Sequence, residues 1–357
     1  MKFPTDFDAV PELVRGFAQA EVPLKWDQLE MAVRKAVFKG RGDILFKILE
    51  ETQWNGVRAT RIMYREAMKG FLLQASIPDR REVIQAVKRS RRMRRLIAKQ
   101  DLIMLGEWKA ARAAEKKDRN PLRNEPPIPF HTDPVALGIL TGIMARASDQ
   151  IHDGLDYNAF IALNIGKLLG KQSWPQLQKM LSNPPPDLEG AKYRDRREQI
   201  HRNLHSIRDL KILADSLKHV AAVLSKTSQF LLVPPTGVTT DSSSVLPVAQ
   251  SNYRKSPKEH ALAIAQLVKN IHLELPILEQ NTEKWEKCAL TQVMDVFHLT
   301  EGKAREKLAN SIHSYDDALE EMKLWVSRKA ETEEVEQEGM DEAYEEDPEE
   351  LKEEEVA

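Results

Sequence analysis

The stretch AVRKAVFKGRGDILFKILEE, residues 32–51, has the pattern of two short amphipathic helices joined by a tight turn. Residues 39–42, Lys-Gly-Arg-Gly, interrupt the apolar pattern, and Asp43 can cap the helix that follows. The apolar residues at helical spacing on the two sides of this turn are Leu29, Ala32, Val33, Ala36 and Val37, then Ile44, Leu45, Ile48 and Leu49. The segment therefore predicts a helical hairpin.

Helical patterns continue through most of the chain on both sides of this hairpin. Asp133-Pro134 is a strong helix start, and the apolar VALGILTGIMARA that follows predicts a buried helix. Aromatic residues make up only 6% of the chain, which disfavours a β-sandwich. Further helices are expected at 60–74, 80–117, 156–181 (a hairpin), 192–232 and 257–328 (two or three helices). We predict an all-α fold of stacked helical hairpins, an irregular α-solenoid or helical bundle, with an acidic disordered C-terminal tail.

Prolines and composition shifts divide the chain into expected units. Residues 120–132 contain four prolines and form a stiff connector, and residues 233–256 are a flexible loop rich in Ser, Thr and Pro. The expected units are 1–119 (hairpins and a long basic helix), the connector 120–132, 133–232 (central hairpins and a long amphipathic helix), the loop 233–256, 257–330 (C-terminal helices) and the acidic tail 331–357.

The formal net charge of −2 hides two regions of opposite sign. Residues 331–357 hold fifteen acids and one base, so this segment carries −14 and the first 330 residues carry +12. So acidic a segment cannot bury enough apolar surface to fold alone. It folds back on basic residues, binds a basic partner or simply keeps the protein soluble.

Lys88 to Lys99, KRSRRMRRLIAK, is the most basic stretch, with seven bases and no acid. On an ideal helix Lys88, Arg91, Arg92 and Arg95 share a face while Arg89 and Arg94 point elsewhere. Like charges at this spacing repel, which favours an anionic partner such as phosphate. An acidic protein surface, a nuclear-import-like patch and a plain solvated face are the alternatives. The candidate nucleic-acid-binding or anion-binding residues are Lys88, Arg89, Arg91, Arg92, Arg94, Arg95 and Lys99.

Catalytic and metal-binding patterns are weak. His201, His205 and Asp209 lie at i, i+4 and i+8, but beside the apolar stripe and with no Glu between the histidines, so a wet helix flank is the better interpretation than a metal site. The sequence has no Gly-rich phosphate loop that follows a strand. We therefore expect neither an enzyme nor a bound cofactor or metal.

Compartment is indicated by a few residues. The single cysteine, Cys288, cannot form an intramolecular disulfide, which favours a reducing intracellular compartment. Asp6 and Asp8 argue against an Arg-rich transit peptide starting at Met1. The longest uncharged apolar run, Val135 to Ala145, is short of the ~20 residues of a membrane-spanning helix, so membrane insertion is not expected.

Residues 32–51 together with NGVRAT at 55–60 resemble the pentatricopeptide repeat, and YNAFIALNIGKLLGKQSWPQLQKML at 157–181 is similar to the opening of such a repeat. No regular array of repeats lies between them. The resemblance implies paired helices that bind RNA, most often in an organelle. We therefore predict a non-enzymatic helical-repeat protein that binds RNA or a ribonucleoprotein in mitochondrial RNA metabolism or translation. The alternatives are a protein–protein scaffold or assembly factor without nucleic acid and, for location, the cytoplasm or nucleus.

Overall fold

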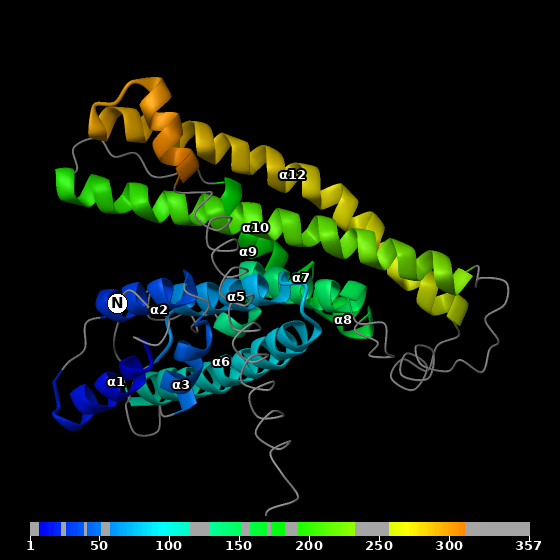
Figure 1. Ribbon diagram of the computed structural model, residues 1–357, viewed down its shortest axis with the longest axis horizontal. Coiled ribbons are helices and arrows are strands. Elements are labelled where there is room, and N and C mark those ends of the chain that lie inside the picture. The colour runs from blue at the N-terminus through cyan, green and yellow to red at the C-terminus, as the bar shows by residue number, and fades with distance from the viewer. Residues whose placement is uncertain are drawn as a thin grey trace, which may run out of the picture.

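The computed structural model is built entirely from helices in the part of the chain that it describes (Figure 1). This part comprises residues 7–22, 26–38, 41–50, 58–114, 129–150, 158–169, 173–182, 192–232 and 257–310. The predicted all-α fold is therefore confirmed. The expected loop 233–256, the acidic tail 331–357 and most of the connector 120–132 lie outside the described residues.

Two buried helices, α5 (Arg61–Ala75) and α7 (Pro134–Gln150), form the centre of the molecule. Thr60 caps α5 by accepting a hydrogen bond from the Met63 amide at 3.2 Å, and Asp133 caps α7 by accepting one from the Ala136 amide at 3.1 Å. The predicted start at Asp133-Pro134 and the predicted burial of α7 are both correct. Helices α1 (Ala9–Gln19), α2 (Trp26–Phe38) and α3 (Asp43–Glu50) lie around α5 at one end (Figure 1).

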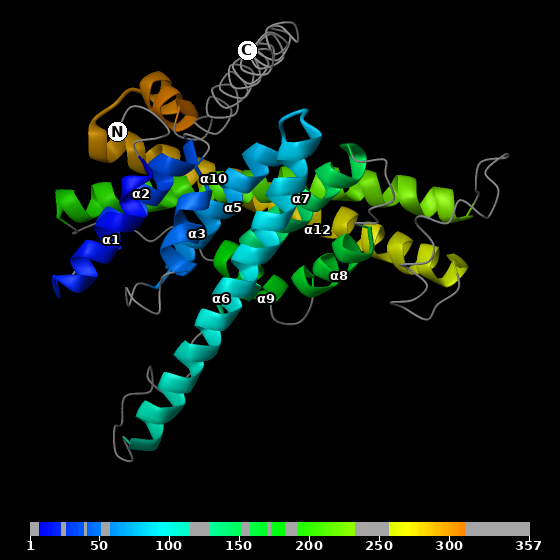
Figure 2. The same ribbon diagram turned by 60° about the horizontal axis from the view of Figure 1, so that its bottom comes forward.

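The long helix α6 (Arg80–Ala114) packs on α5 and α7 through its first half. Its second half extends beyond the other described helices, as Figure 2 shows, and the large apolar side chains of Leu102 and Ile103 are exposed there. The short 3-10 helix η3 (Phe130–Thr132) contacts α6 and leads into α7. Helices α8 (Asn158–Leu168) and α9 (Ser173–Ser182) then pack against α7.

A long antiparallel pair, α10 (Tyr193–Leu232) and α12 (Pro257–Phe297), covers α7 on its other side (Figure 1). Lys211 pairs with Glu286 at 2.7 Å and Lys218 with Glu279 at 2.8 Å, so the partners run in opposite order. Helix α12 continues through Pro276 because apolar residues before and after it pack against α10. Residues 301–310 are also helical, and 311–328 lie outside the described residues.

Within α12, residues Ala261–Phe297 are long and apolar enough to cross a membrane by length and composition alone. In the structure the apolar stripe of this helix faces α10, where Ile264, Val268 and Ile271 are buried. The apolar side of α12 therefore faces the core of the protein.

A network of charged residues joins α5 to Arg34 of α2, to α10 and to Asp133, the cap of α7. Glu66 on α5 lies 2.8 Å from Lys69 Nζ and 2.9 Å from the Arg208 guanidinium of α10. Lys69 also contacts Asp209 at 2.5 Å, and Arg65 reaches Asp133 at 2.7 Å. Lys69 and Arg208 strongly favour the carboxylate form of Glu66 and lower its pKa despite its burial. These contacts fix how the central helices sit against one another.

Helices α7 and α10 approach closely because Gly142 of α7, which has no side chain, faces Ser216 of α10. A Cβ added at Gly142 would lie 2.8 Å from the Ser216 Cβ, which is attached to the α10 backbone and cannot rotate away. We therefore expect Gly142→Ala to lower the free energy of unfolding by about 1–3 kcal/mol, measured by urea denaturation. Gly106→Ala is the control, because nothing lies near Gly106 on α6, and it should raise stability by about 0.5–1 kcal/mol. Stabilisation by both changes would contradict the close contact.

The pH dependence of stability should report on His205, which lies beside the buried charge network. Burial, with the Arg34 and Arg208 guanidiniums, lowers the pKa of His205 to about 3. The unfolded chain, with an ordinary histidine pKa near 6.5, therefore takes up the proton first. Stability from this group is complete above about pH 6.5 and falls as the pH is lowered, by about 2 kcal/mol at pH 5.

We expect His205→Gln to reduce this loss of stability between pH 7 and pH 5, measured by urea denaturation at each pH. The exposed His272 of α12 provides the control substitution, His272→Gln. Buried carboxylates lose their contribution only below about pH 4.5, outside this window. Identical pH profiles for the wild type and His205→Gln would show that His205 is not held neutral by the fold.

Candidate nucleic-acid interface

The seven predicted basic residues between Lys88 and Lys99 all lie on α6, in the half that packs against the body. The side of α6 that faces the core carries small or apolar residues, namely Val83, Ala86, Val87, Ser90, Met93 and Ile97. Because these positions are buried, the basic side chains between them emerge on both flanks of the helix. The flank that faces α7 and α8 differs chemically from the opposite one.

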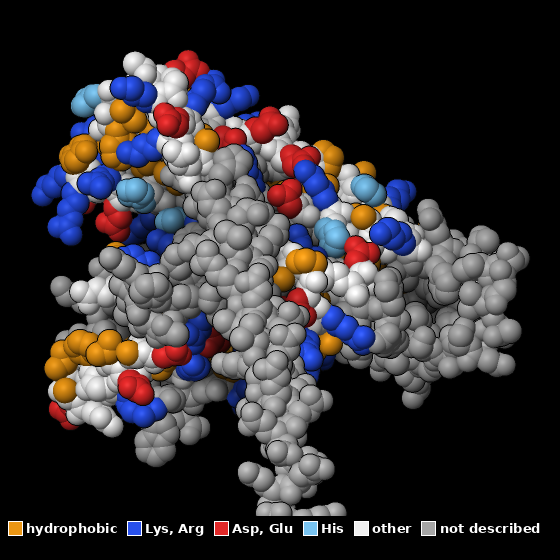
Figure 3. Space-filling model, in the orientation of Figure 1, with side chains coloured by type: hydrophobic (Ala, Val, Ile, Leu, Met, Phe, Trp, Pro, Cys, Tyr) orange, Lys and Arg blue, Asp and Glu red, His pale blue; other side chains and the backbone are white. Residues whose placement is uncertain are grey.

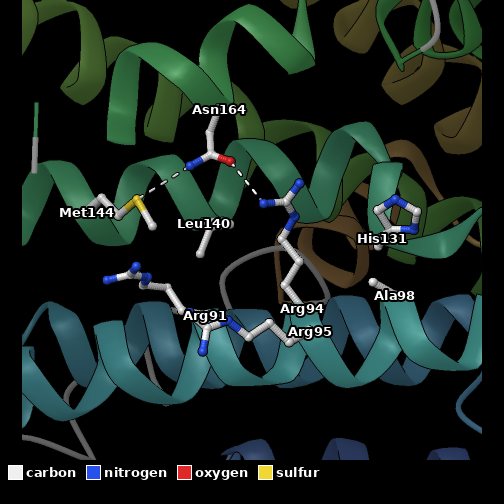
Figure 4. Close-up of a pocket in the computed structure, with 8 residues that line it drawn as sticks. All are labelled: Arg91, Arg94, Arg95, Ala98, His131, Leu140, Met144 and Asn164. Atoms are coloured by element: carbon white, nitrogen blue, oxygen red, sulfur yellow. Dashed lines mark hydrogen bonds between the residues drawn. The ribbon is translucent and has the colours of Figure 1, made fainter. Parts of the chain in front are cut away.

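Arg91, Arg94 and Arg95 line a half-open pocket of about 320 Å³ on the α7–α8 flank (Figure 4). Together with Ala98 they form its α6 wall. The rest of the lining comes from Leu140 and Met144 of α7, Asn164 of α8 and His131 of η3. None of these described lining residues is a carboxylate, so the charged groups of the lining are predominantly guanidiniums.

Arg94 spans the pocket toward α8, as Figure 4 shows. Its Nη1 donates to Asn164 Oδ1 at 3.3 Å, while its buried Nε has no hydrogen-bond acceptor in the described part of the chain. The Asn164 amide in turn donates to the Met144 sulfur at 3.7 Å, a weak acceptor. Partial burial and the positive charge of Arg94 lower the pKa of Lys167 on α8.

His131 is held at the pocket by Asp101 of α6. The Asp101 carboxylate accepts hydrogen bonds from the backbone amides of Phe130 and His131 at 3.0 and 2.9 Å. Its Oδ2 also lies 2.6 Å from His131 Nδ1. This contact commits Nδ1, which leaves Nε2 as the ring nitrogen for another partner. The acid nearest the pocket is thus occupied by backbone and histidine.

The other four predicted residues lie outside the pocket. Arg92 stacks over the Phe46 ring of α3 at 4.6 Å from its centroid, and Arg89 donates to Gln74 at 3.4 Å. Lys88 and Lys99 are exposed. The ideal-helix grouping was therefore wrong for Arg92 and Arg94. Helical spacing alone does not show the partner of each guanidinium. Arg92 is directed by the Phe46 ring and Arg94 by Asn164.

The interpretation of His201, His205 and Asp209 as a wet helix flank is wrong for Asp209, which is buried. Asp209 is engaged by Lys69 at 2.5 Å and by Arg65 at 3.4 Å, so its carboxylate belongs to the buried charge network. Partial burial and nearby cations also lower the pKa of His201. Among the residues that the structure describes, no group of three His, Cys, Asp or Glu side chains could hold a metal ion.

A second basic region lies where α10 begins and residues 301–310 end the described chain, and Figure 3 shows Lys and Arg side chains gathered there. Its exposed members are Lys192, Arg194, Arg197, Arg202, Lys303 and Arg305. Acids are interspersed in it: Glu198 pairs with Arg202 and Glu301 with Arg305, both at 2.5 Å. Part of this region is thus neutralised within the protein.

Sequence reasoning missed the pocket partners of the arginines. Asn164 and His131 are separated from Arg94 by 70 and 37 positions, so no local pattern joins them. The one available signal is Asn164 itself, a buried polar residue in the middle of the largely apolar helix NAFIALNIGKL. A buried amide needs hydrogen-bond partners, so its presence on an apolar helix marks a site.

Comparison with known proteins gives one family. No curated protein and no solved structure matches the chain. Residues 1–232 match the family model described as mitochondrial ribosomal protein mS27, which covers more than half of the chain and includes α6 and the whole pocket. The match does not bear on the pentatricopeptide resemblance, which stays a prediction.

The family places the chain in the mitochondrion and within the mitochondrial ribosome, an assembly of ribosomal RNA and proteins. The predicted mitochondrial location and ribonucleoprotein partner are therefore confirmed, and the cytoplasm and nucleus are set aside. A ribosomal protein family is structural, which agrees with the expected lack of enzyme activity. The chain belongs to the mitochondrial ribosomal protein mS27 family.

Proposed function

We propose that this protein is a non-enzymatic helical subunit that binds ribosomal RNA through Arg91, Arg94 and Arg95 of α6. The observation that carries the proposal is that three guanidinium groups of one helix line a single pocket at the surface of α6. Arginines at i, i+3 and i+4 on one helix repel each other by about 0.2–0.5 kcal/mol per pair. Phosphate groups relieve this repulsion and accept bidentate hydrogen bonds from arginine.

The remaining basic residues of α6 extend the same contact. Lys88 and Lys99 are exposed, so they can follow an RNA backbone along the helix without disturbing the fold. Phosphate contacts of this kind position the RNA but do not read its sequence. The protein therefore holds a folded segment of RNA in place without recognising its sequence.

Protein contacts are the second function that specific observations favour. Exposed apolar side chains gather over α1, as Figure 3 shows, and include Leu13 and Phe17. Leu102 and Ile103 are exposed on the projecting half of α6. Apolar surface of this kind is typical of protein interfaces. We propose that these faces contact neighbouring ribosomal proteins, while the arginine wall contacts RNA.

We also propose that the helix pairs α2–α3 and α8–α9 are divergent helical repeats of the pentatricopeptide kind. Each pair consists of two helices that follow one another closely in the sequence, and each packs on a central helix, α5 or α7. Stacked hairpins of this kind bury apolar faces that an isolated pair would expose. Helix α3 contacts α6, and Asn164 of α8 lines the arginine pocket, so each pair contributes one helix to the surroundings of the basic helix.

Replacement of Arg91, Arg94 and Arg95 by Gln should weaken binding to ribosomal RNA, because three phosphate contacts are lost. The slope of log affinity against log salt should flatten by about 2 to 3, since each contact contributes ~0.7–0.9. Fluorescence anisotropy with labelled RNA over a salt series measures both quantities. Circular dichroism should show unchanged helicity.

The matched control replaces three exposed bases at the start of α10, Lys192, Arg194 and Arg197, by Gln, which removes the same charge from another part of the surface. We expect this control to keep most of the affinity. If the α10 variant loses salt-dependent binding and the α6 variant keeps it, RNA binds at the second basic region and the proposal is wrong. If neither variant nor the wild type binds RNA, the protein-contact function replaces it.

A further inference from the structure

We infer that His131 is a proton-dependent phosphate ligand of the arginine pocket, so that RNA binding at this pocket takes up one proton from the solvent. The proton is held on Nε2 of the His131 ring, which then donates a hydrogen bond to an oxygen of the RNA backbone. This inference rests on the proposed RNA-binding function, to which it adds a further binding residue and a dependence on pH.

Asp101 fixes both the orientation of the His131 ring and the position of its first proton. The buried Asp101 carboxylate accepts hydrogen bonds from two backbone amides of η3, and its Oδ2 lies 2.6 Å from His131 Nδ1. An ionised carboxylate offers only acceptors, so Nδ1 carries the proton that joins the two groups. The neutral ring therefore has a lone pair on Nε2, and only a second proton turns Nε2 into a donor.

The oxygens of an RNA phosphate are acceptors, so they repel the lone pair of an unprotonated Nε2. Once Nε2 is protonated, the same contact becomes a charge-assisted hydrogen bond, which is roughly twice as strong as a neutral one. Phosphate binding and protonation of the ring therefore favour each other, because each stabilises the state that the other needs. Binding should tighten as the pH falls from 8 to 6, the range in which histidine side chains commonly gain their second proton.

His131 is accessible to an RNA strand from the surface. Its side chain is 31% exposed, and it lines the same pocket as the exposed Arg95 (Figure 4). A phosphate can therefore meet Arg95 and His131 together without opening the core. Within the described part of the chain, the hydrogen bonds of the ring engage Nδ1 and leave Nε2 for a ligand.

Charges of both signs act on the His131 ring. Asp101 attracts a positive charge on the ring, whereas the three arginines of the pocket repel it. A phosphate on the arginines offsets this repulsion, which is a second reason for proton uptake on binding. The described charged groups on the other neighbouring elements are Arg61 of α5, which lies over the Phe130 ring, Asp133 at the start of α7, which is paired with Arg65, and Lys167 of α8.

The test measures binding of a labelled single-stranded RNA of mixed sequence to the full-length protein at pH 6, 7 and 8 and constant ionic strength. Fluorescence anisotropy should show affinity at least about fivefold tighter at pH 6 than at pH 8, since one linked proton changes affinity by at most about tenfold per pH unit. Isothermal titration calorimetry in buffers of different ionisation enthalpy measures the proton uptake itself. Circular dichroism at each pH checks that the protein stays folded.

Two substitutions of His131 separate its charge from its shape. His131→Gln keeps a neutral donor, and its RNA affinity should not change between pH 6 and pH 8, without proton uptake. His131→Lys supplies a permanent cation and should bind RNA at pH 8 more tightly than the wild type does. The matched control is His201→Gln, which removes an exposed histidine beside Arg197 in the second basic region and should keep the wild-type pH dependence. Wild-type pH dependence and proton uptake in His131→Gln would overturn the inference.

The inference and the proposed function can be told apart when one of them fails. If the Gln variant of Arg91, Arg94 and Arg95 loses RNA binding while His131→Gln keeps the pH dependence, the inference alone is wrong. If the triple variant binds RNA like the wild type, RNA binds elsewhere and both are wrong. Polyglutamate provides the last probe. If it binds more tightly than the RNA, with the same proton uptake through His131, the pocket takes an acidic protein and RNA phosphate is overturned as its ligand.

Discussion

The buried contact of Glu66 with Lys69 and Arg208 is the constraint on which the arrangement of the central helices depends. Charges without a partner are strongly unfavourable in an interior, so each carboxylate must meet its cation for the core to close. The network continues through Asp209 and Arg65 to the cap of α7 at Asp133. Apolar packing alone tolerates sliding between helices. A chain of paired charges selects one register for α5, α7 and α10.

This register determines the geometry of the arginine pocket. Leu140 and Met144 lie on α7 after the cap at Asp133, and α6 packs against both α5 and α7. The close approach at Gly142 and Ser216 holds α7 to α10 from the opposite side. The walls of the pocket are thus supplied by rigid helices, whose positions are set by the core and not by a ligand. Such preorganisation lowers the cost of ordering a site on binding.

Much of the fold could be predicted from local patterns, because helix starts and apolar stripes are properties of neighbouring residues. Asp133-Pro134 and the apolar spacing before Gly40 are examples. The buried charges could not be predicted in this way, since Glu66 and Arg208 look like solvated residues until α10 is placed beside α5. The same limit applies to the candidate site. Its arginines form a visible run in the sequence, whereas Asn164 and His131 join them only through the packing of α8 and η3 on α7 and α6.

Arginine is used in two opposite ways in this molecule. Arg65 and Arg208 are neutralised by carboxylates of other helices, so they contribute to the folded state itself. Arg91, Arg94 and Arg95 line one pocket that has no carboxylate among its described lining residues. The two pairs at i, i+3 and i, i+4 repel each other by about 0.2–0.5 kcal/mol each. An anion that binds the folded state removes this repulsion and stabilises the fold by mass action. Under the proposed function, RNA phosphate at the α6 flank would therefore couple the stability of this part of the protein to its place in the ribosome.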